Sequence, residues 1–276
     1  MKSILIPTDF SVYAKSALRT GAYIAEQTGA SIHLLTICRA PEEWNRLRVE
    51  QQQKYPNIEA NIVEAEIKLQ KLSEDPVLKN INVFTSVAGG APYEQIVAYA
   101  NRLKIDLIVM GAHGENDTDG PFIGSTAQKV LRRASGLVLS VKKNFKPRQL
   151  KNIVFASDFH PSPDLNNAFK NIKKFVTAVK GNLKLVYINT PAHFLDTETM
   201  EANMRAFAHL HKDLKPQMVT FTDYHTEPGI VKASKRVKAD LLCLATHNRK
   251  LKSNYLLGVT ETVLFHSEIP VLSQVL

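Results

Sequence analysis

The two halves of the chain repeat each other, and this repeat constrains the fold more than any other feature. Residues 3–11 (SILIPTDFS) match residues 152–160 (NIVFASDFH), so each copy opens with an apolar run that ends in Asp-Phe. Residues 104–114 (KIDLIVMGAHG) match residues 238–248 (KADLLCLATHN). Self-similarity of this kind indicates one structural unit used twice. We therefore expect two copies of one fold.

A short basic stretch separates the copies. Residues 142–151 (KKNFKPRQLK) lie between two apolar segments and contain a proline. We expect a domain at residues 1–143, a linker at 144–150 and a second domain at 151–276. The chain has a net charge of +9, but its lysines and arginines are spread along predicted helices and turns. Basic charge supplies nonspecific affinity for nucleic acids. Its spread along the chain, without zinc-finger spacing or an aromatic RNA-binding motif, nevertheless favours a solvated linker over a nucleic-acid site.

Short apolar runs alternate with longer helical patterns in both copies. Strands are predicted near 2–7, 31–37, 81–87, 105–110 and 137–142 in the first copy, and near 151–156, 182–188, 217–222, 239–245 and 269–274 in the second. Helices of the first copy are predicted near 11–28, 42–72 (with a break at Pro56 as an alternative), 92–102 and 125–135. Apolar runs without alternation are typical of strands covered on both faces. The fold class is therefore α/β, with two repeated doubly wound domains, each a five-stranded parallel sheet flanked by helices.

A glycine-rich segment, residues 111–126 (GAHGENDTDGPFIGST), follows a predicted strand and leads into a predicted helix. Gly111 and Gly114 can adopt positive φ, and without a Cβ they let a ligand approach the backbone. The Gly-Ser-Thr run at 124–126 then offers free N–H groups and the positive end of a helix. Such a helix start is an anion site.

Motifs of the common nucleotide-dependent enzymes are absent from the sequence. There is no GxxxxGK[ST], no GxGxxG after the first strand and no GxSxG nucleophile motif. Adenylate-forming and pyrophosphatase-type enzymes usually carry a Ser-Gly-Gly-type loop after the first strand, where this chain reads PTDFS. These observations favour a regulatory or binding protein over an enzyme. Weak ATP hydrolysis stays open as an alternative.

The Asp-terminated first strand, the DLIVMGAHG segment and the G-x-x-G-nine-G-S pattern together resemble the universal stress protein family in its tandem two-domain form. The resemblance covers essentially the whole chain and implies an adenine nucleotide alpha hydrolase-like fold. It also implies a cytoplasmic stress-response regulatory protein that binds ATP, with AMP or ADP left open. The implied contacts are Asp9, Ile37, Met110, Gly111, Gly114, Gly124, Ser125 and Thr126.

An acidic interval between the glycines departs from the usual pattern of the family. Glu115, Asp117 and Asp119 would oppose a triphosphate unless they point outward or a divalent cation bridges them. Mg²⁺ typically binds through few carboxylates together with substrate phosphates. The resemblance therefore leaves Mg²⁺ open as a companion of ATP.

The second copy serves as an internal control. Gly111 corresponds to Ala245, and Ser125 corresponds to Val259, so the glycine site does not persist. Asp106 does persist, as Asp240, which favours a structural role for both carboxylates at a strand edge. We expect one nucleotide site per chain, in the N-terminal domain.

Further expectations concern metal binding, the two thiols, membrane spans and a secretory signal. His209 and His211 are two residues apart on a predicted helix and so face differently, which disfavours metal chelation. Cys38 and Cys243 are expected to be buried free thiols of a cytoplasmic protein. The chain has no run of eighteen apolar residues that would span a membrane, and its start is too short and polar for a secretory signal.

Single-domain members of the family often dimerise through the last strand. The resemblance therefore implies an intrachain pseudo-dimer of the two domains, with a homodimer and an unknown protein partner left open. A pure interaction module whose pocket is vestigial remains the third class of function.

Overall fold

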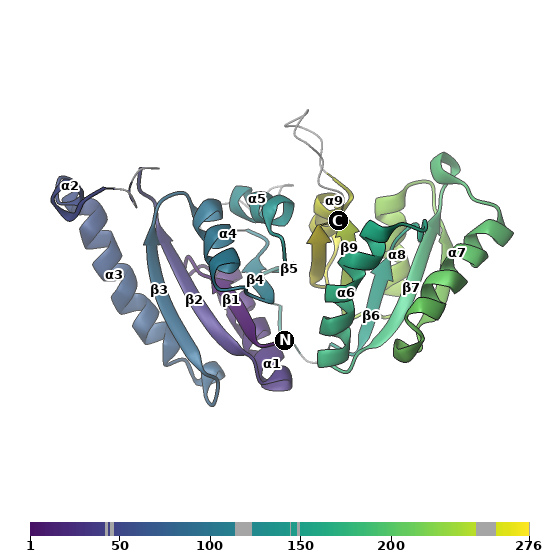
Figure 1. Cartoon of the computed structure of the whole chain (residues 1–276), viewed down its shortest axis with the longest axis horizontal. Coiled ribbons are helices and arrows are strands. Elements are labelled where there is room, and N and C mark those ends of the chain that lie inside the picture. Colours follow the sequence, from purple (N-terminus) through teal and green to yellow (C-terminus); the bar gives the residue numbers. More distant parts are fainter. Residues whose placement is uncertain are drawn as a thin grey trace. The chain divides into compact units, whose positions relative to one another are not determined.

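The computed structural model describes residues 1–41, 44, 47–113, 123–143, 145–147, 150–246 and 258–275. The described residues form two compact units. The first contains the described residues up to Lys146 except Ile123, and the second contains Ile123 and the described residues from Pro147 onward. Each unit has its own parallel strands and its own helices (Figure 1).

The first unit follows the predicted order of strands and helices. Its elements are β1 (Ser3–Pro7), α1 (Val12–Thr28), β2 (Ser31–Cys38), α2 (Val49–Gln52), α3 (Pro56–Ser73), η2 (Pro76–Leu78), β3 (Val83–Gly89), α4 (Pro92–Arg102), β4 (Leu107–Gly111), α5 (Ser125–Arg133) and β5 (Leu137–Val141). The strands lie in the order β3-β2-β1-β4-β5, and all their pairings are parallel.

The second unit repeats this arrangement. Its elements are β6 (Asn152–Ala156), α6 (Pro163–Ala178), β7 (Asn182–Asn189), η3 (Pro191–His193), α7 (Thr197–Leu210), η4 (Lys212–Leu214), β8 (Gln217–Thr222), α8 (Thr226–Arg236), β9 (Leu241–Thr246), α9 (Val259–His266) and β10 (Val271–Val275). The strands lie in the order β8-β7-β6-β9-β10, again parallel. The predicted α/β class with two repeated units is confirmed.

The predicted helix over 42–72 is two helices, α2 and α3. The break falls at Pro56, as the alternative allowed, because proline has no N–H to continue the earlier helix and is tolerated in a first turn. Residues 42, 43, 45 and 46 lie outside the described residues. Trp44 is buried against Gly89 at the end of β3, where an added Cβ would be 2.2 Å from the indole.

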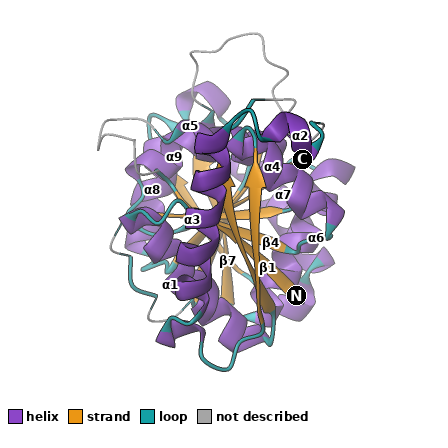
Figure 2. Ribbon diagram, turned by 90° about the vertical axis from the view of Figure 1, so that its left-hand side faces the viewer, coloured by secondary structure: helices purple, strands orange, loops and turns teal. Residues whose placement is uncertain are grey.

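Helices flank the strands of each unit (Figure 2). In the first unit, α1 packs on β1 and β4, α3 packs on β2 and β3, and α4 packs against α5. The central strands are apolar because they are covered: Ile4, Leu5 and Leu107 are fully buried. In the second unit, Phe155, Phe169 and other rings form an aromatic core.

Asp106 and Asp240 hold the first strand of each unit at its start. Asp106 Oδ2 accepts hydrogen bonds from the backbone N–H groups of Lys2 (2.6 Å) and Ser3 (3.2 Å). Asp240 Oδ2 accepts the corresponding pair at the start of β6, at 3.0 and 2.8 Å. The expected structural role of these carboxylates is confirmed, since each satisfies two strand N–H groups.

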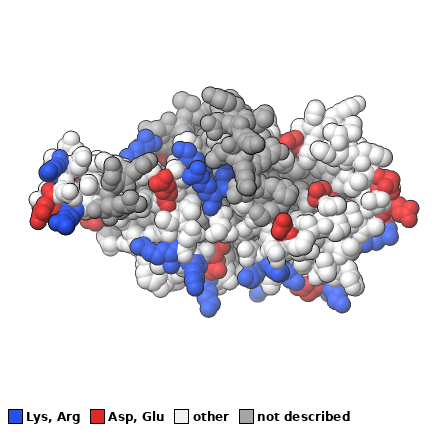
Figure 3. All heavy atoms as spheres, turned by 45° about the horizontal axis from the view of Figure 1, so that its top comes forward, with Lys and Arg blue, Asp and Glu red and all other residues white. Residues whose placement is uncertain are grey.

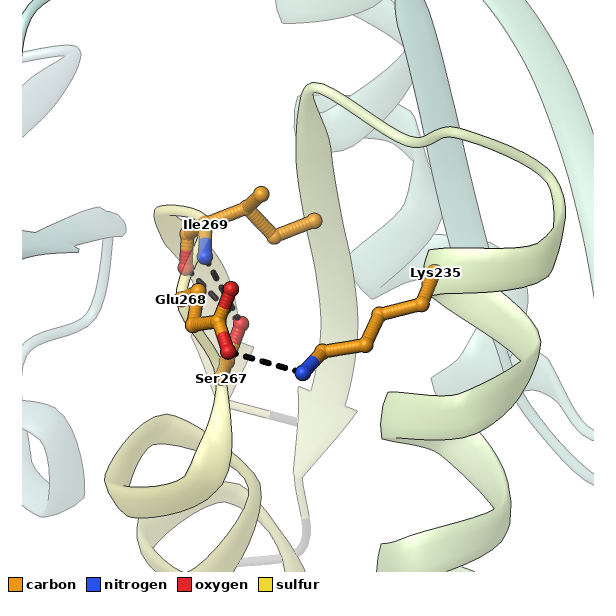
Figure 4. A network of polar contacts seen from close by, with 4 residues as sticks. All are labelled: Lys235, Ser267, Glu268 and Ile269. Carbon is orange, nitrogen blue, oxygen red and sulfur yellow. Dashed lines mark hydrogen bonds and ion pairs between the residues drawn. The ribbon is translucent and has the colours of Figure 1, made fainter.

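In each unit a hydrogen bond between side chains joins the last two helices, with different chemistry in the two units. In the second unit, Lys235 of α8 donates to the Glu268 carboxylate just after α9, at 2.8 Å (Figure 4). In the first unit, Ser135 just after α5 donates to the side-chain oxygen of Asn101 in α4, at 2.9 Å. Both contacts are exposed, so we expect each to contribute little stability.

Candidate functional site

The predicted site residues that the structure describes lie around one edge of the strands of the first unit. The strand order reverses between β1 and β4, and ligands of doubly wound sheets bind at the carboxyl ends of strands at such a switch point. Asp9 follows β1, Ile37 lies near the end of β2, and Met110 and Gly111 close β4. Because the strands are parallel and in register, these ends meet at the same edge.

The turn from β1 into α1 is built by short side chains. Asp9 Oδ1 accepts from the backbone N–H of Ser11 at 3.1 Å, and Thr8 Oγ1 accepts from that of Phe10 at 3.1 Å. Phe10 adopts a positive φ of 65°, which is rare outside glycine. Ser11 then caps α1 by accepting from the N–H of Ala14. The Asp9 carboxylate stays exposed at the edge of the sheet.

The same turn recurs in the second unit. Asp158 Oδ1 accepts from the backbone N–H of His160 at 3.1 Å, and Phe159 has a φ of 53°. The aspartate therefore persists in both copies because it stabilises the turn. Its presence alone does not distinguish a ligand-binding copy from one that binds nothing.

Gly111 does not use the positive φ that glycine allows. The positive-φ glycines among the described residues are Gly29 and Gly90. Gly111 is required for a different reason, the close passage of α1: an added Cβ would lie 2.6 Å from the Tyr13 Cβ and 2.9 Å from the carbonyl oxygen of His113. The Tyr13 and His113 rings also lie in contact, with centroids 5.1 Å apart. Tyr13 is not among the residues predicted to contact the nucleotide, so its place at this edge was missed.

The start of α5 lies directly beside the end of β4. Gly124 is the N-cap of α5 and donates its N–H to the carbonyl of Ala112, the residue after β4, at 2.9 Å. Glycine supplies no side-chain cap, and Ser125 and Thr126 form the first turn, exposed and half-buried respectively. The N–H groups and the positive end of the helix dipole can therefore serve a bound anion.

Ile37 and Met110 differ in what they offer a ligand. Ile37 is half-buried at the end of β2, so part of its side chain is accessible. Met110 is 5% exposed and belongs to the core. Gly114 and the acidic interval at 115–119 lie outside the described residues, so their predicted roles stay predictions.

Cys38, next to Ile37, is a half-buried free thiol. Its Sγ donates to the carbonyl of Asn61 in α3 at 3.5 Å. Burial, followed by the negative charges of Glu64 and Glu66, raises the pKa of the Cys38 thiol. The expectation of a buried thiol is confirmed for Cys243, whereas Cys38 is only partly covered.

Two cavities of the first unit lie away from the predicted site. One, of about 310 Å³, is lined by α4 and the residues before β5, including Ile105 and Ser135. The other, of about 600 Å³, lies between α3 and the edge strand β3 and is lined by Ile67, Gln70 and Thr85 among others. Neither contains a residue predicted to contact the nucleotide.

The corresponding edge of the second unit has different chemistry. Ala245 stands at the place of Gly111, and α9 begins at Val259 instead of a serine. Gly258 remains as the N-cap, and Thr260, which corresponds to Thr126, is buried. The persistence of this threonine was missed by sequence comparison, which had considered only the glycines and the serine.

His209 and His211 do face differently. His209 is exposed, whereas His211 is 8% exposed and packs on the rings of Phe169 and Phe207, with centroids 4.5 and 4.7 Å away. In the part of the chain that the structure describes, no group of three His, Cys, Asp or Glu side chains could hold a metal ion. Among the same residues, no helix is both long and apolar enough to cross a membrane.

Basic and acidic side chains occur together on the face drawn in Figure 3.

Two cationic side chains of α5 contact an aromatic ring of α4. Lys129 and Arg133 lie over the Tyr93 ring of α4, at 4.8 and 4.9 Å from its centroid. Both contacts have the geometry of cation–π interactions, and they join α5, which carries Lys129 and Arg133, to α4, which carries Tyr93.

The repeated strand order defines a doubly wound α/β protein, a fold whose ligands typically bind at the switch point. The model of the universal stress protein family matches residues 1–142 and residues 149–273. The chain therefore belongs to the universal stress protein family, and it contains the family's domain twice.

Relatives of known family support this assignment. Two universal stress proteins of Methanocaldococcus jannaschii are 29% and 27% identical to this chain, each over 51% of it. The matches cover 82% and 95% of those proteins, so each corresponds to about one unit of this chain. A solved universal stress protein from Archaeoglobus fulgidus matches 99% of this chain and 97% of its own, with a TM-score of 0.75 and 17% identity. That likeness extends over both units and shows the tandem fold.

Proposed function

We propose that the first unit binds an adenine nucleotide and that the chain acts as a nucleotide-dependent regulator in the stress response. In this proposal the phosphates bind at the start of α5, at Gly124, Ser125 and Thr126. The adenosine lies over the ends of β1 and β2, against Asp9 and Ile37. ATP is the first candidate, and ADP and AMP offer the same adenosine with fewer phosphates.

The proposal rests above all on the junction between β4 and α5. The 2.9 Å bond from Gly124 N–H to the Ala112 carbonyl sets the helix start against the strand end. The first turn of α5 carries no acidic side chain and presents the exposed Ser125. Because the positive end of a helix attracts negative charge, we expect this turn to bind a phosphate more tightly than it binds a neutral group.

The second unit supports a single site per chain. Val259 at the place of Ser125 has no hydroxyl to donate, and Ala245 replaces the glycine beside α1. Loss of one or two charge-assisted hydrogen bonds weakens binding by about 10- to 10⁴-fold, at roughly 1.5–3 kcal/mol each.

Calorimetric titration of the purified chain with ATP tests the proposal. We expect one site per chain and its loss in Ser125→Asp, because a carboxylate at the first position of α5 repels phosphate while suiting the helix dipole. Thr226→Asp places the same charge at the first position of α8 and is the matched control. Two equal sites per chain, or full affinity in Ser125→Asp, would contradict the proposal.

The same preparations separate the alternative functions. Steady release of ADP by the wild type, abolished in Ser125→Asp, would make the chain an ATP-hydrolysing enzyme. Absence of adenine absorbance on denaturation, together with no thermal shift by ATP, ADP or AMP, would make the pocket vestigial. Titration with and without EDTA measures whether Mg²⁺ takes part.

A further inference from the structure

The first turn of α9 contains a buried carboxylate. Glu261 is the third residue of this helix and is only 6% exposed. Its Oε2 lies so close to the N-cap residue Gly258 that an added Cβ there would be 2.5 Å away. The Glu261 side chain therefore folds back over the start of its own helix, and its carboxylate lies against Gly258.

The first turn of α5, which the structure describes, has no such group. Ala127 corresponds to Glu261 and is 2% exposed in the first turn of α5. The two helix starts are otherwise alike, since each has glycine at the N-cap and threonine at the second position. They differ in that α9 carries its own anion and α5 does not.

A carboxylate at the third helical position is well placed to serve the helix start. The N-terminus of a helix carries roughly half a positive elementary charge, and a Glu at this position can reach back to the N-cap backbone. A phosphate at the same turn would have to approach the carboxylate closely. Two negative charges in a partly buried site repel strongly, because the local dielectric is low.

Thr260, the residue before Glu261, is also buried in the first turn of α9. It is 4% exposed, and its Oγ1 has no hydrogen-bond partner among the described residues. Buried hydroxyl groups nearly always have a partner. Thr260 corresponds to Thr126 of the proposed phosphate site, so the second unit keeps a hydroxyl donor whose acceptor is not supplied by the described protein groups.

We propose that Glu261 is an internal ligand of the second unit: its carboxylate occupies the anion position of α9 and keeps phosphate-bearing ligands out. The identification of this position as a phosphate site rests on the proposed function of the first unit. Glu261 is thereby a residue that decides which of the two copies can bind a nucleotide.

Removal of the carboxylate in the full chain tests this role. The probe is inorganic phosphate, with sodium chloride at matched ionic strength, and the measurements are calorimetric titration and thermal unfolding. The background is Ser125→Asp, which blocks the start of α5. In that background we expect Glu261→Ala to bind phosphate about 10-fold or more tightly than the chain that keeps Glu261. Its unfolding temperature should also rise with phosphate.

Two further variants make the result decisive. Glu227→Ala removes a first-turn carboxylate from α8 and should leave phosphate affinity unchanged. Glu261→Gln keeps the volume of the side chain and loses the charge, so it decides the question if Glu261→Ala does not fold. No gain of phosphate affinity in either Glu261 variant would overturn the proposal.

ATP titration of the wild-type chain tells the two proposals apart. If ATP does not bind while the Glu261 variants gain a phosphate site, the proposed function fails and the role of Glu261 stands. If ATP binds once per chain while the Glu261 variants gain nothing, Glu261 is not the residue that excludes phosphate.

Discussion

Gly111 and Tyr13 pack so closely that any side chain at position 111 would overlap α1. An added Cβ would be 2.6 Å from the Tyr13 Cβ and 3.1 Å from its backbone carbonyl carbon, so a change of rotamer at Tyr13 gives no relief. The end of β4 and the beginning of α1 are therefore fixed to each other at the proposed ligand edge.

Gly111→Ala should destabilise the first unit by about 1–3 kcal/mol, the usual cost of overpacking a well-packed site. Equilibrium urea unfolding measures this. Gly136→Ala is the matched control, because its added Cβ would meet only the Ile105 carbonyl, at 3.6 Å. Equal, small effects of both substitutions would show that α1 yields at position 111.

Asp106→Ala and Asp240→Ala should each destabilise their own unit by about 1–3 kcal/mol, since each removes an acceptor shared by two backbone N–H groups. The effect should be larger for Asp240, which is half-buried, than for the exposed Asp106. Chemical denaturation provides the measurement. Glu26→Ala, at an exposed position of α1, should stay within about 0.5 kcal/mol of the wild type. An equally small effect in both aspartate variants would show that the two carboxylates do not stabilise their units.

The second unit should lose stability at mildly acidic pH because of His211. Burial among Phe169 and Phe207, followed by the positive charge of Lys173, lowers the pKa of His211, although Asp213 acts in the opposite direction. A histidine whose pKa is lowered in the folded state binds its proton more readily when unfolded. The contribution of neutral His211 to the stability of the second unit is therefore fully present above the unfolded-state pKa of about 6.5. This contribution falls as the pH drops below that value.

Thermal unfolding from pH 8 to pH 5 measures this effect. His211→Phe should flatten the acid loss, because neither ring nitrogen of His211 has a hydrogen-bond partner among the described residues. His209→Phe, at an exposed position in the last turn of α7, should leave the pH profile unchanged. An unaltered profile in His211→Phe would assign the acid sensitivity to other groups.

The two thiols should react at very different rates. Complete burial raises the pKa of Cys243 far above that of an exposed thiol, whereas Cys38 is only half-buried. A colorimetric thiol reagent should label one cysteine per chain in buffer and two in urea. Cys38→Ser should abolish the labelling in buffer. Rapid modification of Cys243 in native protein would indicate that the core of the second unit opens.

Much of the fold could be predicted from the sequence. The apolar runs mark the buried strands, and the repeat shows these runs at corresponding positions in both halves. β1 ends at Pro7 and α4 spans Pro92–Arg102, as predicted, and β4 ends one residue after the predicted end. Asp106 could be assigned a structural role because Asp240 repeats it. These features depend on local periodicity or on direct comparison of the two copies.

The details of the site depend on the path of the backbone through space, which periodicity does not report. The reason for glycine at position 111 lies in α1, nearly a hundred residues earlier in the chain. The fold-back of Glu261 onto Gly258 was likewise missed, because the comparison of copies followed the residues that the second copy loses. The carboxylate that it gains is visible only when the burial of the α9 first turn is known.

The buried carboxylate at the start of α9 has a thermodynamic consequence. A helix that holds its own counter-charge needs no solute from the cell, so the stability of the second unit should not vary with nucleotide supply. The first unit, if it binds nucleotide, is stabilised in proportion to the logarithm of ligand concentration. One polypeptide would then contain one unit whose stability changes with nucleotide concentration and a second unit of the same fold whose stability does not.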